Sequence, residues 1–218
     1  NRTKHIMTTL TVQVEANQDD GDRQYDEGAG SWSFSNSNPY NRIGSENSGM
    51  SATATTCYFR FLDVDIPSTA TINSAKLQYK LSANYSYSSK SCRIYAEDIA
   101  SSAAITSDSE MTDAQGDKTS NYATWNLATS SDTSSFQDSA DFTDTIDEII
   151  NVSGWDDGDN NITILLMTPT EADMMDSWEM RIKAHEVSSG ADAPKLVIDY
   201  TAAGGGAVSN PAFLLFID

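Results

Sequence analysis

The chain has 218 residues, and its formal net charge is −19 because 32 Asp and Glu outnumber 13 Lys and Arg. A field of this sign repels nucleic-acid phosphates and anionic lipid surfaces, so we expect neither nucleic acid nor a membrane among the partners. The length suffices for one β-domain with a full core, and no apolar run approaches the ~20 residues that span a bilayer.

Short alternating runs, punctuated by Gly, Ser, Thr, Asn and Asp, indicate an all-β sandwich or barrel. The first two such runs are TLTVQVE and CYFRFLDV, which we predict to be strands with one buried face. In the second run, Cys57, Phe59 and Phe61 fall on the inward parity, and Tyr58 and Arg60 fall on the outward parity.

The clearest strand follows in TINSAKLQYKLSA, where Lys76, Gln78 and Lys80 alternate with the apolar residues from Ala75 to Leu81. The charged residues therefore define its solvent face. Later runs repeat this one-sided pattern, and they are CRIYAEDI, NITILLMTP, SWEMRIKAHEV and PKLVIDY.

One segment changes the period from strand to helix. In SADFTDTIDEIINVSGW the apolar residues recur at helical spacing, which predicts a short helix from about Phe142 to Val152 with Asp141 as its cap. A second helical turn is conceivable in SDSEMTDAQ, but its Ser, Thr and Asp content favours a loop.

The two cysteines, Cys57 and Cys92, both fall on the inward parity of predicted strands. Either a disulfide or two buried thiols fits this placement. A single pair does not make a disulfide scaffold, and free cysteine is among the most buried residue types, so the pattern favours thiols.

Three stretches of the sequence resemble a known family. They are CYFRFLDVDIPSTATINSAKLQYKLSA, then DFTDTIDEIINVSGWDDGDNNITILL, and finally APKLVIDY. They are similar to the DNRLRE-type jelly-roll domain, a carbohydrate-binding-module-like family with a strand, an IP.gAtI.sA.L motif, a helix, a Gly-Trp turn and a closing strand. The resemblance covers about residues 8–201. It implies a jelly-roll β-sandwich that either binds a ligand, as in secreted bacterial enzymes and adhesins, or serves as a structural unit, as in phage virion proteins.

Two Asp-rich loops have the composition of calcium sites. Their carboxylates are Asp19, Asp20 and Asp22 in DDGDR, and Asp156, Asp157 and Asp159 in DDGDN. Ca²⁺ takes six to eight oxygens, often from close carboxylates on a bent loop. Neither loop completes an EF-hand, and Asp and Gly also build ordinary solvated turns. A structural Ca²⁺ and a solvated turn both stay open, and the sequence points to no other cofactor.

Catalytic residue patterns are missing from the sequence. The two histidines, His5 and His185, have no Ser or Cys partner in a recognisable motif, and we interpret them as surface residues. We therefore expect a protein that is not an enzyme.

Three tryptophans share the parity of apolar neighbours in their strands, so we assign Trp32, Trp125 and Trp178 to the core. Trp155 lies in the Gly-Trp turn after the predicted helix, where we expect it to cover the core. Tyr85 and Tyr87 lie where a strand runs into a polar loop. They are candidates for contact with a glycan or a neighbouring subunit, the alternative being ordinary loop packing.

The chain ends in an apolar segment, hereafter the C-terminal segment. Its large side chains are Phe213, Leu214, Leu215, Phe216 and Ile217. They follow the glycines at 204–206, so we divide the chain into an arm (1–7), a sandwich (8–201) and a hinge with tail (202–218). Burial of five such side chains contributes several kcal/mol, at roughly 1.5 to 3 each. The segment either anchors the protein to a partner or folds back onto its own sandwich.

Two function classes follow. The first is a structural protein on a virion surface, such as a phage capsid decoration or tail appendage, which the C-terminal segment holds to copies of itself or to other structural proteins. The second is an extracellular carbohydrate-binding or adhesive module of a secreted bacterial protein that binds cell-surface glycan. A glycan-cleaving enzyme would need a pair of carboxylates in a cleft, which the sequence does not reveal.

Overall fold

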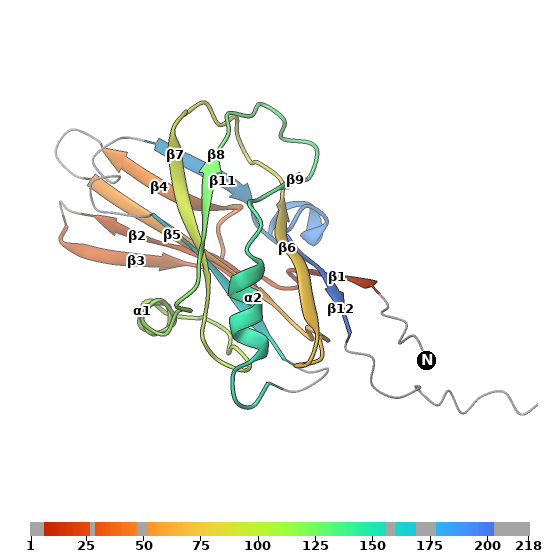
Figure 1. Ribbon diagram of the computed structural model, residues 1–218. Helices are drawn as coiled ribbons and strands as arrows, with labels where there is room; N and C mark the ends of the chain where they lie inside the picture. Colours follow the sequence, from red (N-terminus) through yellow and green to blue (C-terminus); the bar gives the residue numbers. More distant parts are fainter. Residues whose placement is uncertain (1–6, 27–28, 48–51, 156–159, 169–177, 203–218) are drawn as a thin grey trace, which may run out of the picture.

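The computed structural model of the chain describes residues 7–26, 29–47, 52–155, 160–168 and 178–202. These residues form two antiparallel sheets packed as a sandwich, with two short α-helices (Figure 1). The predicted all-β sandwich is confirmed.

The smaller sheet has four strands. Their order is β1 (Met7–Gln13), β12 (Lys195–Thr201), β6 (Thr71–Tyr79) and β9 (Gln137–Asp138). Strand β6 has the predicted register, because Ala75, Leu77 and Tyr79 are buried while Lys76 and Gln78 keep contact with solvent. Strand β1 lies at one edge of this sheet: it pairs with β12 on one side and with no described strand on the other.

The larger sheet has eight strands. They are β2 (Asp20–Asp26), β3 (Ser31–Ser35), β4 (Tyr40–Asn47), β5 (Ala52–Phe61), β7 (Lys90–Ala96), β8 (Ala123–Leu127), β10 (Ile162–Met167) and β11 (Trp178–Lys183). The path runs β11-β4-β5-β10-β7-β8, and β2 pairs with both β5 and β3. In β11, Trp178, Met180 and Ile182 are buried and the residues between them are partly exposed, as predicted.

Two strands differ from the prediction because both of their faces are buried. On β5, Cys57 and Phe59 enter the main core between the sheets, but Tyr58 is equally buried in a second apolar cluster on the outer face. Leu165 of β10 enters the same outer cluster. The prediction of a single buried face is therefore wrong for β5 and β10, which lie at the centre of the larger sheet.

Helix α1 (Asp108–Gly116) covers that outer cluster, at a place where the sequence favours a loop. Ser107 accepts a hydrogen bond from the Glu110 amide, and the Glu110 carboxylate accepts one from the Thr106 amide. This reciprocal capping satisfies the helix start. Met111 and Ala114 bury against the sheet, so tertiary packing outweighs the weak propensity of the polar residues.

Helix α2 (Thr143–Ile150) occupies the predicted position and packs against β6 and β7, where it bridges the two sheets (Figure 1). The N-cap residue is Phe142, which makes no side-chain cap bond, so the prediction of Asp141 as the cap is wrong by one position. The Asp141 carboxylate, one residue earlier, accepts from the Thr143 amide at 3.0 Å. Trp155 follows this helix, is 8% exposed and donates from Nε1 to the Ile66 carbonyl at 2.8 Å. The predicted covering role of Trp155 is confirmed.

Both cysteines are buried free thiols, as the sequence favours. Burial raises the pKa of the Cys57 and Cys92 thiols well above the usual value.

Candidate functional site

The Asp-rich run at residues 19–22 belongs to the folded interior. Residues Asn17–Asp19 form the 3-10 helix η1, and Asp20 begins strand β2. In the β2–β5 register Asp20 lies opposite Phe59 and Asp22 lies opposite Cys57, so both carboxylates point to the side of the main core. Asp19, Asp20 and Asp22 are each at most 1% exposed. The solvated-turn interpretation is therefore wrong for this run.

Gly21, which the sequence suggests as a turn residue, is required by close packing. A Cβ atom at this position would lie 2.6 Å from the Ser35 carbonyl oxygen and 2.7 Å from the Tyr58 ring. Only a residue without a side chain fits between β3 and that ring.

Two of the three aspartates are held by arginines. Asp22 accepts from Arg42 Nε at 2.7 Å and from the Arg42 amide at 3.2 Å, which ties β2 to β4. Burial raises the pKa of Asp22, while the bonds and charge of Arg42 oppose that rise. Asp19 accepts from Arg60 of β5 at 2.7 Å through Oδ1. These carboxylates serve as structural links between elements.

Asp20 has no such cation. Its Oδ2 atom accepts from the His185 amide at 2.9 Å. Burial raises the pKa of Asp20 to about 8, and the charge of Glu186 raises it further, while the His185 amide and the Asn41 side chain lower it. Asn41 is 1% exposed, and its side chain faces the Asp20 carboxyl group.

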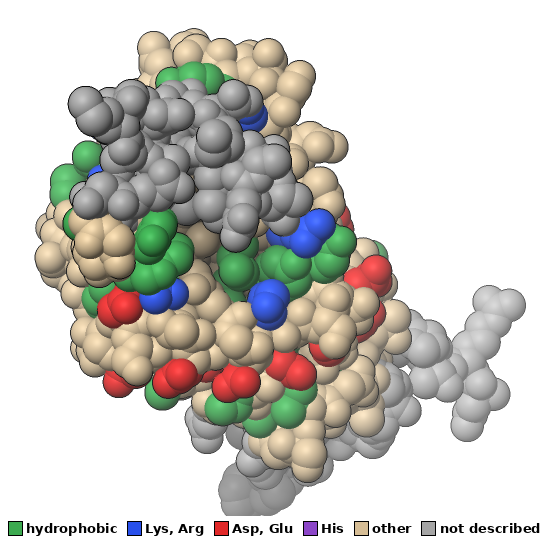
Figure 2. Space-filling view, turned by 90° about the vertical axis from the view of Figure 1, so that its left-hand side faces the viewer, with side chains coloured by type: hydrophobic (Ala, Val, Ile, Leu, Met, Phe, Trp, Pro, Cys, Tyr) green, Lys and Arg blue, Asp and Glu red, His purple; other side chains and the backbone are tan. Residues whose placement is uncertain are grey.

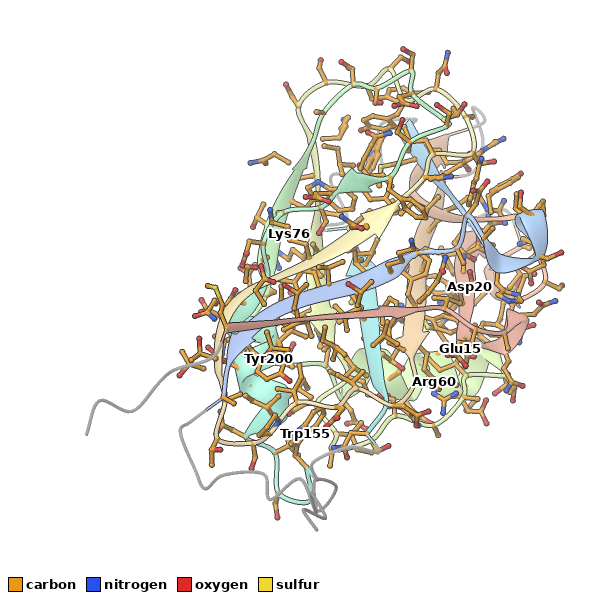
Figure 3. The ribbon with its side chains drawn as sticks, turned by 90° about the vertical axis from the view of Figure 1, so that its right-hand side faces the viewer. Glu15, Asp20, Arg60, Lys76, Trp155 and Tyr200 are labelled. Atoms are coloured by element: carbon orange, nitrogen blue, oxygen red, sulfur yellow. The ribbon has the colours of Figure 1, made fainter. Side chains whose placement is uncertain are left out.

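Glu186 is the residue of this group that sequence reasoning missed. It lies between β11 and the 3-10 helix η3 (Val187–Gly190), next to the residue whose amide binds Asp20. Burial raises the pKa of Glu186, while its own amide and the charge of His185 lower it. Figure 3 labels Asp20 at the end of the sandwich where Glu15 and Arg60 also lie. We call Asp20, Glu186 and Asn41 the acidic corner.

Among the described residues, no three His, Cys, Asp or Glu side chains come close enough together to hold a metal. Asp156, Asp157 and Asp159 lie outside the described residues, as do Phe213, Leu214, Leu215, Phe216 and Ile217. Strand β12 ends at Thr201, which lies opposite Met7 of the edge strand β1.

The tyrosine pair predicted for glycan or subunit contact is split between core and surface. Tyr85 is 2% exposed and belongs to the main core, whereas Tyr87 is 40% exposed and packs its ring at 5.7 Å from that of Tyr85. Of the two, Tyr87 is therefore available for contact.

A larger aromatic surface lies on β2 and β3. Trp32, assigned to the core by its parity with Phe34, is instead 38% exposed, so that prediction is wrong. Its ring lies 5.0 Å from the Tyr25 ring and 4.0 Å from the guanidinium of Arg23. The reason is topological, because β3 pairs with no described strand except β2 and lies at the sheet margin. On this end of the molecule hydrophobic side chains are interleaved with Lys and Arg (Figure 2).

His185 is not the lone strand residue that the sequence suggests. Strand β11 ends at Lys183, and the His185 ring is partly buried with Nδ1 2.9 Å from Asn17 Oδ1. Among the described residues, no serine or cysteine side chain is hydrogen-bonded to this ring. His5 lies outside them.

No family model matches the chain, and no curated protein sequence matches it. The resemblance to the DNRLRE-type domain therefore rests on the residues quoted for it. In the described part of the chain, no helix is long and apolar enough to cross a membrane.

Proposed function

We propose that the chain is a non-enzymatic structural protein that assembles through its C-terminal segment, as a virion surface protein such as a phage capsid decoration or tail appendage would. One observation carries the proposal: the sandwich closes before that segment begins. In the described part of the chain, the main core is formed by residues from Val14 to Ile198, and the closing strand β12 ends at Thr201. The burial energy of the five later apolar side chains is then available for a partner.

The partner is a second copy or another structural protein. Strand β1 offers a sheet edge beside the point where β12 ends, and Met7 on it is 70% exposed. A strand added to such an edge gains main-chain hydrogen bonds along its length. Pro211 lacks an amide hydrogen, so pairing by the C-terminal segment would begin after it.

The state of the candidate nucleophiles in the described part of the chain supports the non-enzymatic part of the proposal. The two thiols are buried with raised pKa values, and His185 contacts an amide oxygen of Asn17. A thiol of this kind is neither exposed nor ionised, as a nucleophile must be.

The test is a double substitution, Phe213→Ser with Phe216→Ser, followed by light scattering after size-exclusion chromatography. Loss of the assembled species with an unchanged melting temperature is expected, because the glycines at 204–206 separate the segment from the sandwich. Ile99→Ser, a change of one exposed apolar residue elsewhere, serves as the control and should keep the assembly. If the double variant instead loses several kcal/mol of stability, the segment belongs to its own core.

A second candidate, a carbohydrate-binding module, is favoured by the exposed ring of Trp32 beside Tyr25 and Arg23. Flat aromatic faces with polar neighbours suit sugar rings. Binding on a glycan array that Trp32→Ala abolishes would establish this function, and an array without binding would exclude it for the glycans tested.

A further inference from the structure

Strand β8 lies at one edge of the larger sheet. It pairs with β7 in a regular register, and with no described strand on its other side. Proteins ordinarily protect such an edge with a charged residue, a proline or a bulge. Residues 121–131 contain neither a charged residue nor a proline, although the chain carries a formal charge of −19. The free side of β8 can therefore accept a further strand.

A groove runs along this free side. One wall is β8 with the residues that follow it, and the other is the segment that leads from β9 into α2, which lies beside β8 in Figure 1. Two hollows of about 300 and 510 Å³ meet at Thr124. Tyr79 and Trp125 line the larger hollow, with their rings 5.0 Å apart and their side chains mostly buried. A strand in this groove, hereafter the β8 groove, gains apolar contact as well as main-chain hydrogen bonds.

We propose that the β8 groove binds the C-terminal segment of a second copy of this chain, which adds to β8 as an antiparallel strand. The inference rests on the proposed assembly and names its docking site. Residues 212–217 span about 20 Å when extended, which matches the five residues of β8. Neither residues 202–217 nor residues 121–131 carry a charge, so pairing of the two strands brings no like charges opposite each other.

The direction of β8 decides where the added strand begins. The later residues of β8 lie beside Tyr79, and its first residues lie beside the start of α2. An antiparallel strand on β8 must therefore begin near Tyr79. Thr201, where β12 ends, pairs with Thr71 at the opposite end of β6, which is ~27 Å from Tyr79 along that strand.

This geometry favours a second copy over the same chain. The straight line from Thr201 to the start of the added strand also crosses from one sheet to the other, which makes it about 30 Å through the core and longer around the surface. The 11 steps from residue 201 to residue 212 reach at most about 36–40 Å. Within one chain the connection would be almost fully extended, which is entropically costly for the glycines at 204–206. A neighbouring copy imposes no such condition.

The first experiment places a lysine on each of two competing edges of the full chain. Thr124→Lys adds a long charged side chain where the two hollows meet, and Thr11→Lys makes the same change at an exposed position of the edge strand β1. By light scattering after size-exclusion chromatography, Thr124→Lys should lower the assembled fraction at least tenfold, and Thr11→Lys should leave it within twofold. An intact assembly in Thr124→Lys, or its loss in Thr11→Lys, would overturn the assignment.

A peptide of residues 209–218 tests the groove without a change in it. The full-length double variant Phe213→Ser with Phe216→Ser should bind this peptide saturably, and binding should slow hydrogen exchange in β8 but not in β1. A peptide with the same two substitutions should bind at least tenfold more weakly. Absence of binding, or slower exchange in β1 alone, would overturn the groove as the site. An unchanged full chain that is monomeric would refute the proposed assembly, and peptide protection of β8 in that case would refute only the second copy as the source of the strand.

Discussion

The ion pair between Arg42 and Asp22 permits a quantitative test of how the buried acidic residues hold this fold. Asp22 is 1% exposed and accepts its shortest hydrogen bond, at 2.7 Å, from Nε of Arg42, whose side chain is 21% exposed. Removing one partner of a buried pair leaves the other charge without compensation, at a cost of about 3–5 kcal/mol. Because Arg42 is not fully buried, we expect Arg42→Met to cost about 3 kcal/mol.

Urea denaturation at pH 7 measures this loss of unfolding free energy. Two further variants test whether the stranded charge of Asp22 causes it. Asp22→Asn in the Arg42→Met background should restore most of the stability, because it removes the stranded charge. Lys76→Met serves as the control: its partner Asp138 is 3.7 Å away and both side chains are more than 40% exposed, so its loss should stay below about 1 kcal/mol. A cost for Arg42→Met no larger than that of Lys76→Met would refute the reasoning.

Three further predictions follow from buried groups. The folded-state pKa of Asp20 is about 8 and its ordinary value is 3.8, so its proton stabilises the fold fully below pH 4, and this contribution is lost as the pH rises through 8. The melting temperature should therefore fall over this range, and Asp20→Asn should flatten the profile. Cys57 and Cys92 should react with a thiol reagent only after unfolding in urea, and two thiols labelled in the native state would contradict their burial. Trp155→Phe leaves the Ile66 carbonyl without its donor and should cost about 1–3 kcal/mol by urea denaturation, whereas no loss would show that water replaces the bond.

Local patterns in the sequence predict the strands whose two faces differ. Strand β6 is the clear case, since alternating lysines mark the solvent side from Lys76 onward. The same reasoning fails for Tyr58, because a residue on the outward parity can be buried by a distant element, in this case helix α1. That helix is itself hard to predict, because its polar residues give a weak signal and its stability comes from Met111 and Ala114 packing on the sheet.

The acidic corner shows a related limit. The sequence identifies Asp20 as a candidate ligand by its acidic neighbours, yet those neighbours bind arginines. The amide that holds Asp20 belongs to His185, 165 residues further along the chain, and Glu186 follows it in a segment with no motif. A pairing of this kind is set by how β11 leads into η3 next to the start of β2. Single-sequence patterns do not encode that arrangement.

The central claim is that the sandwich folds by itself while the C-terminal segment assembles it. The most direct measurement compares the full chain with a chain stopped after Thr201, by light scattering after size-exclusion chromatography and by urea denaturation on the same samples. By light scattering, we predict that the full chain forms a larger species and that the shortened chain is monomeric. By urea denaturation, we predict that the shortened chain has the same free energy of unfolding as the monomeric full-length double variant Phe213→Ser with Phe216→Ser. Identical masses for the full and shortened chains, or a shortened chain that is less stable than that monomer by several kcal/mol, would contradict the claim.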